Sequence, residues 1–354
     1  MNALTMNSMQ RTLTALGQKE PDQVPLFLLT TMHGARELNL TIEDYFSSAD
    51  YVAEGEMRLR QKYRSDCHYA FFYASIETEA WGGTTLYLPD GPPLCGAPVI
   101  QRPEDIDTLQ APDVASAAPL AKVLATIRAL KQRVGDTVPI VGVAISPFSL
   151  PVMQMGFHAY LELIHEQPER FEKLMQANEA FTVAWANAQL EAGATAICYF
   201  DPVASTTILP RALYQRTGMR VAQRTLAQIK GPTATHLASG RGLSLVDDLI
   251  STGTSVIGVS AQEDLAQWKQ AAAGRVNLLG NLNGVEMRRW TPQQAEDAVK
   301  NAIAKAARGG GFILSDNHGE IPWQVSDEVL LAIGDAVQRW GRYPLNWVAD
   351  HACS

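Results

Sequence analysis

The sequence predicts an α/β protein, a (β/α)8 TIM barrel, and three observations carry this prediction. Eight short apolar runs each end in polar residues, which is the pattern of parallel strands buried on both faces. Segments with helical spacing and charged outer faces separate most of these runs. No Gly-rich dinucleotide-binding turn follows the first run, which disfavours the open doubly wound sheet, the main alternative. Repeated strand–helix units with right-handed crossovers therefore favour a barrel.

The expected elements cover nearly the whole chain, which we expect to form one domain, residues 1–354. The expected strands are residues 24–30, 68–73, 139–145, 195–200, 233–237, 255–259, 276–280 and 311–314. The expected helices are residues 116–134, 159–193, 211–230, 243–253, 264–273 and 292–308. Glycines 193, 253, 274 and 309 close or follow four of these helices, where a left-handed residue is favoured. Residues 84–89 and 95–100 flank an Asp-Gly-Pro-Pro turn and predict a β-hairpin inserted after the second strand, over part of the barrel mouth.

Composition excludes several classes of partner. The net charge is −8 and the chain has no basic run, so nucleic acid is not an expected partner. No apolar stretch approaches the roughly 20 residues of a membrane span, and the N-terminus has no signal-peptide core. Four cysteines without a CxxC pair suggest reduced thiols. We therefore expect a cytoplasmic protein with no membrane partner.

Polar side chains follow nearly every expected strand. In α/β barrels the chemistry lies at the carboxyl ends of the strands. Isolated serines at these positions are more often helix caps or turn residues. Ionisable groups at a barrel mouth are costly unless they are used or paired, so Glu77, Asp201, His236 and His318 are the candidate catalytic residues. Candidates for substrate binding are His33, Tyr73, Phe148, Asn281 and Trp323.

Four segments at strand ends resemble the uroporphyrinogen decarboxylase superfamily. They are residues 76–82 (IETEAWG), 199–205 (YFDPVAS), 235–240 (THLASG) and 314–322 (LSDNHGEIP). The opening residues 11–16 and 21–25 are similar to the first helix and first strand of that superfamily. The similarity extends from about Arg11 to Tyr343, and the order and spacing of the segments are more specific than any one of them.

Within the superfamily, the corrinoid-dependent methyltransferases are the more similar branch. Porphyrinogen decarboxylases carry an Arg-rich segment of the type RQAGRY after the first strand, whereas residues 30–36 contain one arginine here. Tyr73 stands where their catalytic Asp is expected. Residues 77–82 and 201–205 are similar to the EAEALG and DPSAS segments of the methyltransferases. The resemblance implies transfer of a methyl group between a small methylated substrate and the cobalt of a corrinoid (cobalamin-type cofactor) on a partner corrinoid-binding protein.

The thiol-activating zinc site of some methyltransferases is altered in this chain. His236 matches the first ligand, but Ala238 stands at the position of the first Cys, and residues 316–318 replace the second Cys motif. Two alternatives follow. A metal site, with zinc as one candidate metal, would use His236, His318, Glu77 and Asp316, or Asp201 as its carboxylate. The other alternative is a metal-free hydrogen-bonding pocket.

The resemblance also implies roles in demethylation, in which the leaving heteroatom needs a proton. His236 is the first candidate for the proton donor and His318 the second, with Glu77 and Asp201 tuning them. Two other functions stay open: a decarboxylase or other lyase acting on a small acid, and a non-catalytic tetrapyrrole- or corrinoid-handling protein. A homodimer that packs through the residues around Trp347 is a further expectation.

Overall fold

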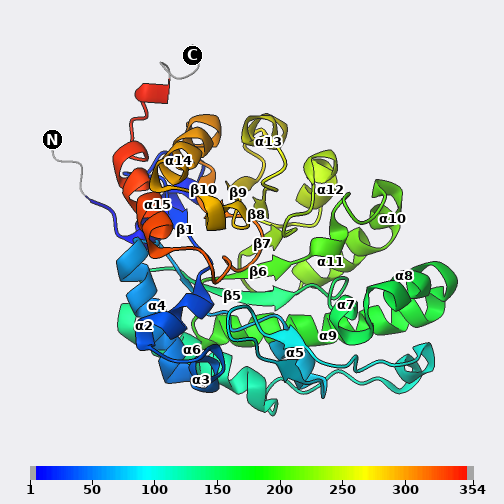
Figure 1. Ribbon diagram of the computed structural model, residues 1–354. Helices are drawn as coiled ribbons and strands as arrows, with labels where there is room; N and C mark the ends of the chain where they lie inside the picture. The colour runs from blue at the N-terminus through cyan, green and yellow to red at the C-terminus, as the bar shows by residue number, and fades with distance from the viewer. Residues whose placement is uncertain (1–4, 349–354) are drawn as a thin grey trace.

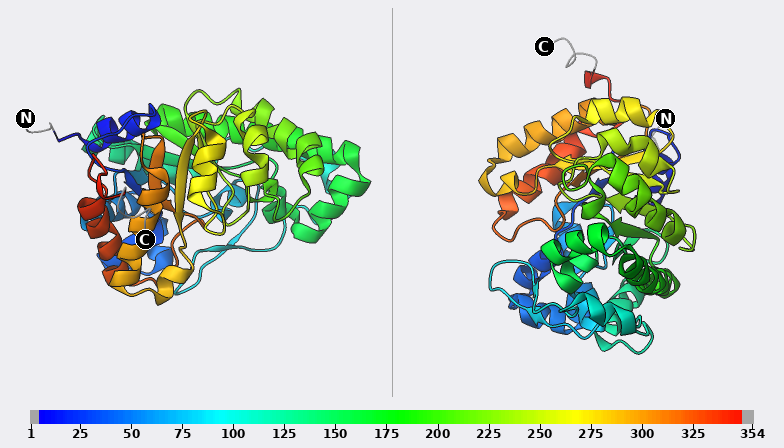
Figure 2. Two further views of the ribbon diagram at one scale, coloured as in Figure 1. Left: turned by 90° about the horizontal axis from the view of Figure 1, so that it is seen from above. Right: turned by 90° about the vertical axis from the view of Figure 1, so that its right-hand side faces the viewer.

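The computed structural model describes residues 5–348 and confirms the predicted fold class. Eight parallel strands form one curled sheet in the order β1-β10-β9-β8-β7-β6-β5-β2, surrounded by helices (Figures 1 and 2). The strands are β1 (Leu26–Phe27), β2 (His68–Tyr69), β5 (Ile140–Ile145), β6 (Ala196–Phe200), β7 (Thr233–His236), β8 (Val256–Gly258), β9 (Asn277–Leu282) and β10 (Phe312–Asp316). Each lies within or overlaps one of the eight apolar runs.

The helices follow the expected order with two interruptions. They are α1 (Ser8–Leu16), α2 (Gly34–Leu38), α3 (Ile42–Ser47), α4 (Ala49–Tyr63), α5 (Ser75–Ala80), α6 (Ala118–Val134), α7 (Pro151–Met155), α8 (Phe157–Glu166), α9 (Pro168–Ala192), α10 (Arg211–Arg216), α11 (Gly218–Leu226), α12 (Val246–Ile250), α13 (Leu265–Ala272), α14 (Pro292–Ala306) and α15 (Asp327–Trp340). The expected helix 159–193 is broken at Gln167 (φ −132°) because the following proline disfavours helical geometry there. The expected helix 211–230 is broken at Thr217 (φ −122°).

The hairpin expected after the second strand is not confirmed at its predicted length. Strands β3 (Thr85–Leu86) and β4 (Leu94–Cys95) pair antiparallel, but over only two residues on each side. Prolines at positions 89, 92 and 93 lack the N–H group that a longer ladder would need. The segment between β3 and β4 still reaches the barrel mouth, where Pro92 and Pro93 lie against a cavity described below.

Alternate residues of the parallel strands fill the barrel interior, because successive side chains of a strand point to opposite faces. The buried interior cluster contains Phe27, Cys67, Tyr69, Val141, Val143, Cys198, Val256, Leu279 and Ile313. The intervening residues face the helices and contribute to two larger apolar clusters. Apolar side chains therefore fill the barrel interior, and the polar groups lie at the ends of the barrel.

The barrel has a seam between its first two strands. Within residues 5–348, β1 and β2 share no strand ladder, although the Asp66 N–H donates to the Leu26 carbonyl at 2.6 Å. The buried Asp66 carboxylate accepts from the Leu26 N–H (3.1 Å), Ser8 Oγ (2.8 Å) and Arg11 Nη1 (2.6 Å). Helix α15 packs beside α4 on this side of the molecule (Figure 1). One carboxylate thus joins α1, β1 and the start of β2.

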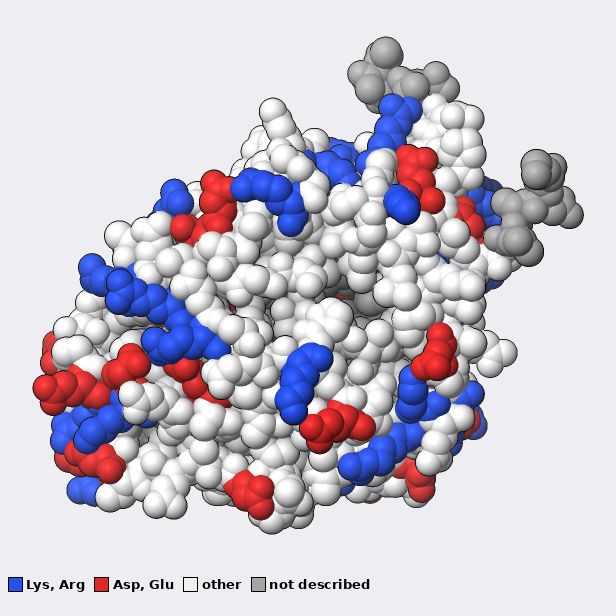
Figure 3. All heavy atoms as spheres, turned by 180° about the vertical axis from the view of Figure 1, so that it is seen from behind, with Lys and Arg blue, Asp and Glu red and all other residues white. Residues whose placement is uncertain are grey.

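The described part of the chain has interspersed surface charges and free thiols. None of its helices is both long and apolar enough to cross a bilayer. Basic and acidic side chains are interspersed on the face shown in Figure 3. Cys67, Cys95 and Cys198 are free thiols, and Cys353 lies outside the described residues.

Candidate active site

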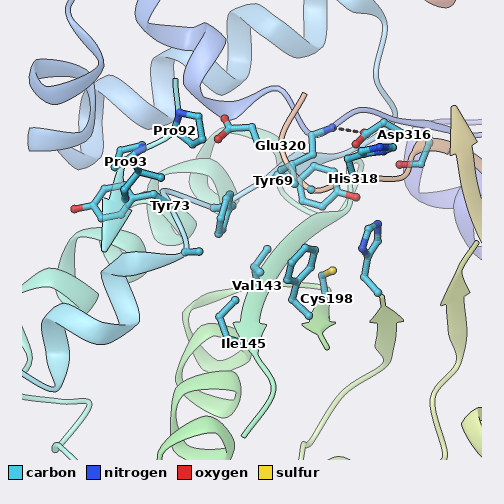
Figure 4. A pocket seen from close by; sticks show the side chains of 18 residues that line it. Tyr69, Tyr73, Pro92, Pro93, Val143, Ile145, Cys198, Asp316, His318 and Glu320 are labelled. Carbon is cyan, nitrogen blue, oxygen red and sulfur yellow. Dashed lines mark hydrogen bonds between the residues drawn. The ribbon is translucent and has the colours of Figure 1, made fainter. Parts of the chain in front are cut away.

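A cavity of about 280 Å³ opens at the carboxyl ends of the barrel strands (Figure 4). This volume lies near the lower end of the ~300–1,000 Å³ typical of ligand pockets. The described residues that line it include no lysine and no arginine, and most are apolar or aromatic. The lining is formed by Leu29, Tyr69, Phe71, Tyr73, Ala74, Pro92, Pro93, Leu94, Val143, Ile145, Cys198, Phe200, His236, Ser315, Asp316, His318, Gly319 and Glu320.

His236 ends β7 and is held in one orientation. Its Nδ1 accepts a hydrogen bond from the Ala238 N–H at 3.0 Å, and its ring stacks on Phe200 with centroids 5.1 Å apart. Burial, and secondarily the nearby His318, lowers the pKa of His236 to about 4. The ring is therefore neutral near pH 7, and because Nδ1 accepts, the proton resides on Nε2. His236 offers the cavity a hydrogen-bond donor rather than an imidazolium acid.

Two carboxyl groups line the cavity from β10 and the loop after it. Asp316 is buried and accepts from the Leu29 N–H at 3.1 Å (Figure 4), and burial raises its pKa to about 7. Glu320 accepts from the Met32 N–H, and burial raises its pKa to about 8. Its Oε2 is buried without a hydrogen-bond partner among the described residues. Near neutral pH these carboxyl groups are the ones facing the cavity that hold a transferable proton.

His318 and Tyr73 complete the polar lining. His318 is half-buried, and burial lowers its pKa, so it also tends to be neutral. The Tyr73 hydroxyl donates to Glu79 Oε1 at 3.0 Å and accepts from the Tyr87 hydroxyl at 2.9 Å. Thr85 Oγ1 donates to the same Glu79 oxygen at 2.5 Å. This network fixes the Tyr73 ring in the wall and places an acidic group directly behind it.

Two of the expected catalytic acids lie outside the cavity lining. Asp201 is buried and accepts from the hydroxyls of Ser146 and Ser149, both at 2.6 Å, and burial raises its pKa to about 6. Glu77 accepts from the Ile145 N–H at 2.9 Å, and burial raises its pKa to about 8. Both carboxyls connect the loops after β2, β5 and β6 rather than face the cavity.

Four of the residues expected to bind substrate also lie away from the cavity. The buried His33 is 5.9 Å, ring to ring, from Trp323, which itself packs under the Arg36 guanidinium. Phe148 is packed against the aromatic rings of α8 and α9. The Asn281 amide donates to the carbonyls of Ser260 and Glu263. Of the expected site residues, the structure brings His236, His318, Asp316 and Tyr73 together at the cavity.

Several cavity residues were not singled out from the sequence. Tyr69, Phe71, Cys198 and Phe200 face the interior because they alternate with outward-facing residues along β2 and β6. Counting alternate positions backward from the strand ends identifies this set. Glu320 falls inside the 314–322 segment, and its place in that segment was the available signal.

The arrangement of donors does not fit the expected metal set. Among residues 5–348, no three or more His, Cys, Asp or Glu side chains form a group suited to hold a metal ion. Glu77 in particular is committed to the Ile145 N–H and lies outside the lining that contains His236, His318 and Asp316. The Nδ1 atom of His236 is occupied by the Ala238 N–H. The donors present fit a hydrogen-bonding pocket better than a coordination site.

Gly258 of β8 leaves the space in which the His236 ring sits. A Cβ atom at position 258 would lie 2.9 Å from His236 Cδ2 and 3.2 Å from its Cγ, closer than carbon atoms pack. Gly258→Ala is therefore expected to displace the imidazole and to lower about tenfold the affinity of the cavity for the ligand proposed below. Titration calorimetry measures this affinity.

The matched control is Gly284→Ala, also near the mouth, where a Cβ would meet its nearest neighbour at 3.8 Å. This variant is expected to bind as the unmodified protein does. Equal affinities for both variants would show that the position of the His236 ring does not matter for binding.

The fold and the cavity together define an α/β-barrel enzyme with its site at the carboxyl ends of the strands. The model of the uroporphyrinogen decarboxylase (URO-D) family matches residues 7–340, and the chain belongs to that family. The uroporphyrinogen decarboxylase of Methylococcus capsulatus is 26% identical over 309 residues, covering 83% of this chain and 85% of its own. That of Burkholderia pseudomallei is 26% identical over 313 residues, covering 83% of each chain.

Solved structures share the fold at lower sequence identity. A methyltransferase from Methanosarcina mazei superposes with a TM-score of 0.85 at 18% identity, covering 94% of this chain and 99% of its own. A putative vitamin-B12-independent methionine synthase from Listeria monocytogenes gives a TM-score of 0.54 at 15% identity, covering 91% of this chain and 98% of its own. At these identities the likeness establishes the architecture.

Proposed function

We propose that this protein is a methyltransferase that moves a methyl group between a small substrate in the cavity and the cobalt of a corrinoid carried by a partner protein. The observation that carries the proposal is the cavity itself, which is small and largely apolar and has no lysine or arginine among its described lining residues. The similarity of residues 77–82 and 201–205 to corrinoid-dependent methyltransferases supports the same reaction.

The cavity argues against the reaction for which the curated relatives are named. A porphyrinogen with eight carboxylates needs cationic partners, because buried carboxylates are stabilised by paired charges. Here no lysine or arginine is among the described lining residues, and the protonated carboxyls of Asp316 and Glu320 supply no positive charge. A volume of about 280 Å³ also suits a ligand smaller than a tetrapyrrole.

The protein's part in methyl transfer is to hold the substrate and manage protons. The corrinoid of the partner would supply the cobalt nucleophile that accepts the methyl group, and in the reverse direction it would supply the methyl group itself. The side chains of Val143, Ile145 and Phe200 exclude water around the methyl group. The Nε2–H of His236 points a fixed donor at a polar atom of the substrate. Asp316 and Glu320 exchange protons near neutral pH, a role the sequence assigned to His236 and His318.

The proposal is tested by mixing the protein with a Co(I) corrinoid protein and a panel of methylated amines, ethers and thioethers. We expect the absorbance of methyl–Co(III) to form with at least one donor class, and only when this protein is present. A heat-denatured sample is the control for uncatalysed methylation. The absence of any spectral change over the panel would contradict the proposal.

A further inference from the structure

The cavity has an unbalanced set of charges. Asp316 and Glu320 line it, Glu79 lies behind Tyr73, and no lysine or arginine is among the described lining residues. The two imidazoles at the cavity do not compensate, because burial lowers the pKa of both His236 and His318. The site therefore holds acidic groups without a cationic partner.

The groups packed around the two carboxyls from other elements are neutral or acidic as well. Asp316 faces Tyr69 of β2 and Cys198 of β6. Glu320 faces Tyr45 of α3 and Glu56 of α4, and its Oε1 accepts from a backbone N–H of η1 (Thr31–His33). A buried carboxylate without a partner is costly, so burial keeps both groups largely protonated up to near-neutral pH while the cavity contains no cation.

Aromatic rings form much of the remaining wall. Tyr69, Phe71 and Tyr73 come from β2 and the chain that follows it, and Phe200 comes from the end of β6. Figure 4 shows Tyr69 beside Asp316 and His318, and Tyr73 on the opposite side of the lining, beside Pro93. The faces of such rings carry negative charge density and attract quaternary ammonium groups.

We propose that the cavity binds a quaternary methylammonium cation, and that its binding displaces a proton from Asp316 or Glu320. The aromatic wall surrounds the methyl groups, and the resulting carboxylate is the counter-ion. The role of this cation as methyl donor rests on the proposed function. Its binding in the cavity does not require a corrinoid.

An ammonium donor also matches the acid–base state of the site. In the transfer, the bond between the methyl carbon and nitrogen breaks, and its electron pair stays on nitrogen to give a neutral tertiary amine. The methyl carbon bonds to cobalt through the electron pair of the partner's Co(I) corrinoid. The leaving amine needs no proton, so the absence of an imidazolium at His236 is no obstacle.

The test is titration calorimetry with choline and with 3,3-dimethyl-1-butanol, its uncharged carbon isostere, at pH 6 and pH 8. At pH 6 the bound cation must force a proton off a carboxyl, whereas at pH 8 part of that cost is gone. Affinity for choline is therefore expected to rise about tenfold from pH 6 to pH 8, with release of about one proton at pH 6. The affinity for the isostere is expected to be lower and independent of pH.

Variants that retain the backbone hydrogen bonds locate the charge. Asp316→Asn and Glu320→Gln keep an acceptor for the N–H groups of Leu29 and Met32. The double variant is expected to lose both the pH dependence and about 1,000-fold in choline affinity, tenfold more than Asp316→Asn alone. The control is Glu166→Gln, which removes an exposed carboxylate at the end of α8, outside the lining, and is expected to leave both unchanged.

Two results would overturn the proposal: affinity for the isostere equal to that for choline, or choline binding that is independent of pH in the unmodified chain. Neither result depends on the corrinoid reaction. If the inference fails in this way and a neutral donor still methylates the corrinoid, the proposed function stands without a cationic substrate.

Discussion

Replacing Asp316 by Asn is expected to lower kcat/KM for methyl transfer from a quaternary ammonium donor about 100-fold, or ~2.7 kcal/mol of transition-state stabilisation. Asn keeps the hydrogen bond from the Leu29 N–H and the shape of the wall, but it cannot become the counter-ion of a bound cation. The loss is expected mainly in KM, because the charge is paired in the bound and reacting states alike.

The measurement is the initial rate of methyl–Co(III) formation at several donor concentrations. Glu166→Gln serves as the control for the loss of one negative charge outside the lining. A fall of less than threefold in Asp316→Asn, with the control unchanged, would remove Asp316 from the account of the site. In that case Glu320 alone would be left as the counter-ion.

Replacing Asp66 by Ala is expected to destabilise the fold by about 3–5 kcal/mol. The substitution removes the acceptor for the Leu26 N–H at the seam and leaves the largely buried Arg11 guanidinium with Asp22 as its remaining carboxylate partner. A buried group that loses its partner keeps its full desolvation cost. Unfolding in urea, followed by circular dichroism, measures the change.

Asp335→Ala is the matched control, because Asp335 also pairs with an arginine, Arg64, but both side chains are largely exposed. It is expected to change the free energy of unfolding by no more than about 1 kcal/mol. If Asp66→Ala cost as little as this control, Asp66 would not hold the seam between β1 and β2.

The recurrence of apolar runs and helical segments along the sequence was sufficient to predict the barrel. Residues 139–145 and 195–200, for example, became β5 and β6 because a continuous apolar run bounded by polar residues has few other places in a fold. The breaks at Gln167 and Thr217 were missed, since helical spacing continues across both. Helices α2, α3 and α4 were also not anticipated between the first two strands.

The site was predicted less completely, for a physical reason. Strand ends identify which residues reach the mouth, but the direction of each side chain depends on local hydrogen bonds. Asp201 turns to Ser146 and Ser149, and Glu77 turns to a backbone N–H of β5. Such contacts between distant segments have no signature along the chain.

The chemistry of His236 was also decided by its surroundings. Its position was expected from the 235–240 segment, but its neutrality follows from burial and from the Ala238 N–H that occupies Nδ1. In the proposed function the proton-exchanging role therefore passes to Asp316 and Glu320, whose burial the sequence did not reveal.

The central claim, that this barrel transfers methyl groups and does not decarboxylate porphyrinogens, is tested most directly on one preparation in two parallel assays. One follows methyl–Co(III) formation from a quaternary ammonium donor and a Co(I) corrinoid protein, and the other follows CO2 release from uroporphyrinogen. We expect methyl–cobalt to form, and to form about 100-fold less efficiently with Asp316→Asn, while no CO2 is released above the background without protein. Enzyme-dependent CO2 release without methyl–cobalt formation would contradict the account.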